Sequence, residues 1–166
     1  MNDSRKSAFA PVVSADVRVL ILGSLPGDAS LAAGRYYAHR ANRFWHLVGS
    51  VIGRADLPTL DYDARLAVLL SAGIGLWDVI ASATRQGSLD AAIRDAQPAA
   101  LADLVARLPA LRAVAFNGAT AARIGRRLLA DTAPRLVDLP SSSPAHAAMP
   151  LDEKLRRWRI LQQFLA

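Results

Sequence analysis

Four short apolar segments, separated by segments of helical character, constrain the fold of this chain more than any other feature of its sequence. They are Val17–Gly23, Ile74–Ile80, Leu111–Gly118 and Pro134–Pro140. Each is rich in aliphatic or β-branched residues and is bounded by glycine or proline or by a turn, a pattern typical of buried strands. Strands that alternate with helices predict a parallel sheet that is covered on both faces.

Five segments with helical spacing of apolar residues, or with signals of a helix boundary, fill the intervals. They run from near Asn42 to residue 53, over Asp63–Gly73, over Pro98–Pro109, over residues 119–130 and over residues 151–166. No internal repeat, low-complexity tract or long linker divides the chain. We therefore predict one α/β domain over residues 1–166, with residues 1–8 as a flexible tail.

Length and composition exclude several classes of protein. The 166 residues suffice for one core, and no apolar run approaches the length that spans a membrane. The N-terminus lacks the apolar segment of a signal peptide. Cysteine is absent, and the histidines (His39, His46 and His146) lack the spacing of metal ligands. We expect a cytoplasmic monomer that binds no metal, no cofactor and no membrane.

The net charge of +6 favours a polyanionic partner such as nucleic acid. All but two of the 20 basic residues are arginines, and the exceptions are Lys6 and Lys154. Heavy arginine and alanine usage is equally typical of a GC-rich genome. Composition alone leaves both interpretations open.

Ligands of open parallel sheets bind beyond the carboxyl ends of the strands, so the loops there are the candidate site. After the first strand, Gly23, Ser24 and Leu25 begin the loop "GSLPG", whose backbone amides could hold a phosphate or a carbonyl oxygen. Its spacing is neither that of a dinucleotide-binding loop nor that of a P-loop. The alternative is an ordinary turn between a strand and a helix.

Asn117 ends the third apolar segment, so its carboxamide should point into the cleft beyond the sheet. An amide presents an acceptor oxygen beside a donor nitrogen, which complements the N–H and C=O edge of uracil and hypoxanthine. One carboxamide of fixed orientation could therefore separate these deaminated bases from cytosine and adenine. The alternative is a common Asn-Gly turn.

The loop "SSSPAHA" after the fourth strand combines hydroxyl groups, a rigid proline and a histidine near the start of a helix. Such groups could grip a phosphate beside an extruded nucleotide, or the loop could simply connect to the last helix and cap it. The candidate DNA contacts in this loop are Ser141, Ser142, Ser143, Pro144 and His146.

The stretch "YYAHRANRFW" crowds four aromatic residues around one asparagine. Tyr37 is a candidate platform for a flipped base, and Asn42 could orient a water or serve as a helix N-cap. Phe44 and Trp45 share helical spacing with the apolar residues that follow, so we expect both in the core. Candidate phosphate contacts are Arg40, Arg43, Arg85 and Arg123.

In this order the motifs resemble the uracil-DNA glycosylase superfamily. The stretch "YAHRANRFW" is similar to "FAHPxNRFW" of the mismatch-specific uracil/thymine glycosylase branch. The segments "GSLPGDASLAAGRYYAHRANRFW", "GLWDVI", "GSLDAAI", "FNG" and "LPSSSPAHA" resemble the hypoxanthine-DNA glycosylase branch still better, and the resemblance extends from Phe9 to the last helix. It implies a three-layer α/β/α fold with a central four-stranded parallel sheet, and excision of a damaged base from DNA.

The resemblance also implies roles for particular residues. In the hypoxanthine branch Asn42 would assist catalysis and Asn117 would read the base, while Tyr37 stands where the mismatch branch stacks a phenylalanine. Leu25 replaces the asparagine with which the "GINPG" loop of the mismatch branch helps to position water, and this departure disfavours ordinary uracil chemistry. The serine loop replaces "NPSGLSR", which leaves open the residue that fills the vacated duplex.

We therefore expect a DNA repair glycosylase that flips a deaminated base, hypoxanthine by preference, out of duplex or single-stranded DNA and hydrolyses its bond to the sugar. The two lysines lie in the tail and in the final helix, away from the expected cleft, so no amine is available for a lyase step and an abasic site should remain. The alternatives are a glycosylase directed at uracil or mismatches and a non-catalytic protein that binds damaged DNA.

Overall fold

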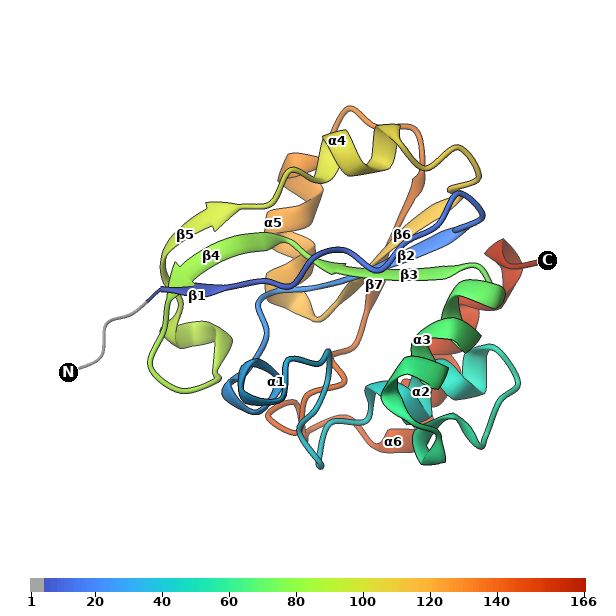
Figure 1. Cartoon of the computed structure of the whole chain (residues 1–166), viewed down its shortest axis with the longest axis horizontal. Coiled ribbons are helices and arrows are strands. Elements are labelled where there is room, and N and C mark those ends of the chain that lie inside the picture. The colour runs from blue at the N-terminus through green and yellow to red at the C-terminus, as the bar shows by residue number, and fades with distance from the viewer. Residues whose placement is uncertain (1–4) are drawn as a thin grey trace.

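The computed structural model describes residues 5–166, and a four-stranded parallel sheet with the strand order β3-β2-β6-β7 lies at its centre (Figure 1). The strands are β2 (Val19–Gly23), β3 (Ile74–Asp78), β6 (Ala113–Asn117) and β7 (Arg135–Leu139). Every residue of β2 is buried, because this central strand is covered on both faces. The parallel sheet predicted from the four apolar segments is confirmed.

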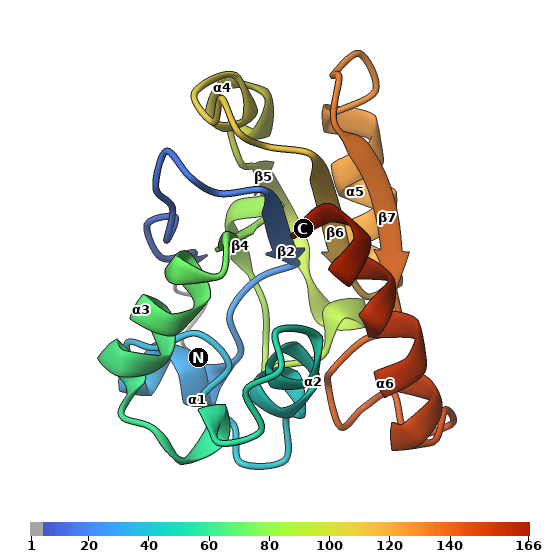
Figure 2. The same cartoon turned by 90° about the vertical axis from the view of Figure 1, so that its right-hand side faces the viewer.

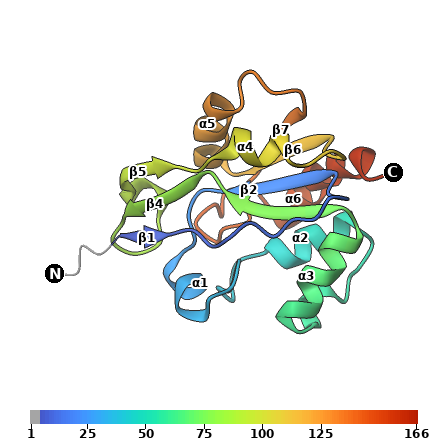
Figure 3. The ribbon, with the colours of Figure 1, turned by 45° about the horizontal axis from the view of Figure 1, so that its top comes forward.

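Helices cover both faces of this sheet (Figure 3). One face packs against α2 (Phe44–Val51), α3 (Tyr62–Ser71) and α6 (Leu151–Trp158), and the other against α4 (Leu101–Ala106) and α5 (Ala119–Leu128). Side chains alternate along β2, so that Val19 and Ile21 enter the first core and Leu20 and Leu22 the second. The predicted three-layer α/β/α arrangement is confirmed.

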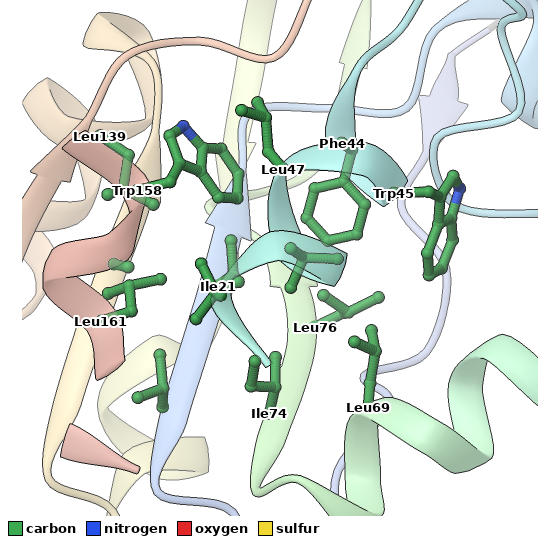
Figure 4. Close-up of a cluster of buried hydrophobic side chains, with 14 of the residues drawn as sticks. Ile21, Phe44, Trp45, Leu47, Leu69, Ile74, Leu76, Leu139, Trp158 and Leu161 are labelled. Atoms are coloured by element: carbon green, nitrogen blue, oxygen red, sulfur yellow. The ribbon is translucent and has the colours of Figure 1, made fainter. Parts of the chain in front are cut away.

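The aromatic start of α2 is anchored in the first core (Figure 4). Phe44 makes edge contacts with Trp45 and Trp158, with ring centroids 5.0 and 5.8 Å away. The expectation that Phe44 and Trp45 belong to the core is confirmed. Because both are buried, the chain that enters α2 through Asn42 has a fixed position relative to the sheet.

A second, antiparallel sheet lies beside the first and was not predicted. Its strand order is β1-β4-β5, with β1 (Lys6–Ser7), β4 (Ile80–Thr84) and β5 (Arg94–Pro98). β4 continues the direction of β3 after one residue, whereas β5 is exposed along its whole length and carries no apolar alternation. Of the tail expected over residues 1–8, residues 1–4 lie outside the described part, and Lys6 and Ser7 pair with β4.

Several short elements complete the chain. They are α1 (Asp28–Ala33) and the 3-10 turns η1 (Leu57–Thr59), η2 (Asp90–Ala92) and η3 (Arg159–Phe164). Arg18 and Arg112 donate hydrogen bonds to carbonyls of Leu165 and Phe164, which holds the C-terminal segment against the amino ends of β2 and β6 (Figure 2). Within residues 5–166 no helix has the length and apolarity needed to cross a membrane.

Candidate active site

A cavity of about 420 Å³ opens beyond the carboxyl ends of β2, β3 and β6. Its walls come from parts of residues 23–30, 36–42, 88–90, 117–120 and 141–146, together with Asp78. It brings together the predicted base-binding and catalytic residues and the residues of the serine loop. The four candidate phosphate contacts contribute no lining: Arg40, Arg43 and Arg123 are exposed outside it, and Arg85 is buried. Its volume falls within the range of small-molecule sites.

Tyr37 presents its ring to this cavity from a constrained backbone. The ring stacks on Phe44 with centroids 3.8 Å apart and planes 13° from parallel. The residue has a φ of 53°, which is unfavourable for a tyrosine. The indole N–H of Trp45 donates to the Tyr37 carbonyl at 3.1 Å and helps to hold this conformation. Strained backbone of this kind is characteristic of functional sites.

The Asn117 carboxamide has a fixed orientation. Its Oδ1 accepts the backbone N–H of Ser142 at 2.9 Å, so this atom must be the oxygen. Its Nδ2 donates to the Ser142 hydroxyl at 2.9 Å and makes a longer contact of 3.4 Å with the Tyr37 hydroxyl. Asn117 therefore keeps one lone pair of its oxygen and one weakly engaged N–H for a ligand in the cavity.

Asn42 lies just before α2, and the N-cap position that the sequence offered for it is occupied by Arg43, without a side-chain cap. The Asn42 Oδ1 instead accepts the backbone N–H of Phe44 at 3.0 Å, a local turn at the entrance to the helix. The same side chain lines the cavity. This hydrogen bond orients the carboxamide, and its Nδ2 and second oxygen lone pair remain for a ligand or a water.

The loop after β2 forms another wall. A β-carbon on Gly23 would lie 2.7 Å from Asp78 Oδ1 and 3.1 Å from the Tyr37 hydroxyl, so only glycine leaves these groups room. Ser24 donates a hydrogen bond to Asp90 at 2.6 Å, and the Leu25 side chain is buried in the second core.

Sequence reasoning missed Asp78, the last residue of β3. It lies beside Gly23 in the sheet register, lines the cavity and is only 3% exposed. Burial, and after it the negative charge of Asp90, raises the pKa of its carboxyl and Arg85 lowers it, which together give a pKa of about 7. Its place at the end of an apolar strand was the same signal that identified Asn117.

Arg85 does not contact a phosphate as predicted, because its side chain is completely buried. It donates hydrogen bonds to the carbonyls of Pro26 and Gly87, the latter at 3.1 Å. Its Nη1 lies 3.9 Å from Asp90 Oδ1. Arg85 therefore braces the loop 85–92 against the wall formed by the loop after β2.

The serine loop contains one buried serine and several residues that line the cavity or its rim. Ser142 is only 1% exposed and is bonded to Asn117, so its predicted role as a phosphate contact is replaced by that of orienting Asn117. Ser141 and Ser143 line the cavity and accept backbone N–H groups of their own loop at 3.1 and 3.2 Å. Pro144 and His146 are exposed on its rim. Within residues 5–166 no cluster of three or more His, Asp or Glu side chains could hold a metal ion.

Comparison with known proteins agrees with this architecture. Residues 10–163 match the family described as the uracil DNA glycosylase superfamily. A hypoxanthine DNA glycosylase of Methanosarcina barkeri is 43% identical over 114 residues, which cover 69% of this chain and 72% of that protein. A hypoxanthine DNA glycosylase of Methanosarcina acetivorans is 38% identical over 141 residues, which cover 85% of this chain and 88% of that protein.

A solved structure is also similar over nearly the whole chain. It is the solution NMR structure of a protein from Methanosarcina acetivorans described as a candidate uracil DNA glycosylase. The two folds superpose with a TM-score of 0.86 at 34% identity, over 97% of this chain and 99% of that one. The extent of these matches in sequence and in fold means that this chain belongs to the uracil DNA glycosylase superfamily.

Proposed function

We propose that this protein hydrolyses the bond between deoxyribose C1′ and a deaminated base in DNA, hypoxanthine by preference, and leaves an abasic site. The enzyme class, a DNA N-glycosylase, follows from the family and from its two relatives. The observation that carries the proposal is the convergence of Asn42, Asn117 and the Tyr37 ring on one cavity. The names of the relatives support hypoxanthine as the base.

Base recognition would rest on Tyr37 and Asn117. A base held against the tyrosine ring would present its edge to a carboxamide whose oxygen and nitrogen cannot exchange places, because Ser142 fixes them. The free lone pair of Oδ1 suits the N–H of hypoxanthine or uracil, and the remaining N–H suits the adjacent carbonyl. Adenine and cytosine present an amino group beside an unprotonated nitrogen. Against Asn117 this would place acceptor opposite acceptor and donor opposite donor.

Hydrolysis would rest on Asn42. An amide is too weak a base to deprotonate water, but the sugar is nearly a cation when the bond breaks, and a positioned water then suffices. The hydrogen bond from the Phe44 N–H holds the Asn42 carboxamide at the cavity wall, where it could bind such a water.

Both lysine amines are held by polar groups of other segments of the chain. Lys6 pairs with Asp28 at 2.6 Å, and the buried Lys154 donates to the His146 carbonyl at 2.8 Å. Neither lysine is part of the cavity lining. Each amine thus braces a loop, which supports a monofunctional enzyme without a Schiff-base step.

Base flipping needs a side chain that fills the space left in the duplex. Leu89 suits this role, because it is 61% exposed and lies at the cavity on the loop 85–92. That loop is braced by Arg85, and the Ser88 hydroxyl accepts the backbone N–H of Asp28 at 2.9 Å. A large apolar side chain on a supported loop is the kind of wedge that DNA-bending proteins insert between bases.

Shortening this wedge should impair the reaction on duplex DNA only. We expect Leu89→Ala to slow single-turnover release from a duplex by about 10- to 100-fold, because unstacking a base opposes flipping by a few kcal/mol. On single-stranded DNA with the same lesion the rate should change little. An equal loss on both substrates would contradict the wedge role, and Ile160→Ala, an exposed apolar residue outside the cavity lining, is the matched control.

The preferred base can be tested with labelled duplexes that contain inosine, uracil or no lesion, under single-turnover conditions and with alkali to break abasic sites. We expect inosine to be cleaved well, uracil poorly and the undamaged duplex not at all, with no break before alkali. Faster cleavage of uracil would mean that Leu25 is no obstacle and that the base assignment is wrong. Tight binding without cleavage would contradict the enzymatic proposal.

A further inference from the structure

Asp78 is the one buried carboxylate of residues 5–166, and the proposed mechanism leaves it without a role. Its Oδ2 has no hydrogen-bond partner among the described residues. Its Oδ1 lies against the bare face of Gly23, the place that the Tyr37 hydroxyl also approaches. A buried polar atom without a partner is unfavourable by about 1–3 kcal/mol, so its presence in the wall of a cavity calls for a ligand.

Burial and the Asp90 carboxylate favour the neutral form of Asp78, and Arg85 opposes them. Tyr36 and Tyr37 face it from the aromatic stretch, and Arg85 and Asp90 face it from the loop 85–92. The Arg85 guanidinium is turned toward the Pro26 and Gly87 carbonyls and the Asp90 carboxylate. Burial raises the Asp78 pKa to about 7, so near neutrality a large fraction of the carboxyl groups carries a proton.

We propose that the Asp78 carboxyl is a catalytic group of this enzyme, which gives a hydrogen bond and then its proton to a ring nitrogen (N7 or N3) of the departing purine. The inference rests on the proposed function, because it requires a purine in the cavity. Asp78, Gly23 and Asn117 end three strands side by side, so a base that Asn117 holds would lie close to this carboxyl.

The proton and electron balance is simple. As the bond between C1′ and N9 breaks, its electron pair moves into the purine ring, and the carboxyl proton passes to N7 or N3, so that neutral hypoxanthine leaves. The water held by Asn42 forms the new bond to C1′ and loses one proton to solvent. Solvent then reprotonates the Asp78 carboxylate. One water is consumed, and the sugar gains a hydroxyl.

This role distinguishes purines from pyrimidines. Hypoxanthine has ring nitrogens with free lone pairs that a neutral carboxyl can protonate. Uracil has no such nitrogen, and its charge on departure lies largely on carbonyl oxygens, which amide donors can stabilise. A neutral Asp78 carboxyl in the cavity wall therefore assists the release of hypoxanthine more than that of uracil.

The test compares Asp78→Asn with the wild type in single-turnover release of hypoxanthine and uracil. Asparagine keeps the shape but has no acidic proton, so hypoxanthine release should fall by about 100-fold or more. Any uracil release and the binding of lesion DNA should change much less. Asp138→Asn is the matched control, because Asp138 is exposed on β7 outside the cavity.

The pH profile gives a second, independent readout. In the wild type the rate constant for hypoxanthine release should fall as the pH rises through the range near 7, where Asp78 loses its proton, and in Asp78→Asn this decline should be absent. Full activity of Asp78→Asn on inosine, or a wild-type rate that rises with pH in this range, would overturn the inference while leaving the glycosylase proposal intact. A wild type that releases no hypoxanthine would overturn both.

Discussion

Replacement of Asn42 by alanine is expected to slow hypoxanthine release by about 100- to 1000-fold while leaving the binding of lesion DNA almost unchanged. The reason is that its carboxamide, held by the hydrogen bond from the Phe44 N–H, would position the water but would not contribute to the stacking of the base. The measurements are single-turnover rates on an inosine duplex and a binding titration with the same DNA.

The hydrogen bond to Phe44 complicates this experiment, and a second variant separates the two roles of Asn42. Alanine removes this hydrogen bond as well and should lower the free energy of unfolding by about 1 kcal/mol. Asn42→Ser keeps a hydroxyl that can accept the Phe44 N–H but has too short a side chain to reach the water, so its stability should be nearly that of the wild type and its activity should still be lost. Recovery of activity in Asn42→Ser would show that only the hydrogen bond to Phe44 matters.

The main sheet could be predicted from the sequence because its strands are buried on both faces. A strand such as Val19–Gly23 must be apolar throughout, and that pattern is visible without any partner. Arg94–Pro98 shows the opposite case. It is exposed and polar, and only its pairing with β4 makes it a strand, so no local pattern marks it. The second sheet therefore could not be predicted from local sequence patterns.

The candidate site likewise contains features that the sequence predicts and features that only the fold reveals. The position of Asn42, Asn117 and Tyr37 at one cavity could be predicted because each lies at an element boundary or within a distinctive motif, while their roles stay predictions. The support of Asn117 by Ser142 joins residues that are 25 positions apart, and nothing local indicates which serine of three turns inward. Arg85 resembles a DNA contact in the sequence, yet it is buried because carbonyls of two loops converge on it. The roles of Ser142 and Arg85 are therefore decided by hydrogen bonds between residues that lie far apart in the sequence.

Asp78 lets the proposed chemistry be checked through stability as well as through rate. Its pKa of about 7 in the folded protein lies above the usual value of 3.8, so the folded state binds a proton that the unfolded state has lost over the intervening pH range. Stability therefore falls as the pH rises from about 4 to about 7 and stays low above it. At pH 8 this penalty amounts to roughly 4 kcal/mol, and at pH 5 to less than about 2 kcal/mol.

Asp78→Asn removes that penalty, since an amide stays neutral at every pH. The free energy of unfolding of the variant relative to the wild type should thus increase by roughly 2–3 kcal/mol between pH 5 and pH 8, measured by urea titration of both proteins. A difference that does not change with pH would mean that the carboxyl is not destabilised in its ionised form. A variant that is more stable at pH 8 yet poor at releasing hypoxanthine would indicate that the unfavourable carboxyl is retained for catalysis, as expected where activity requires a destabilised group.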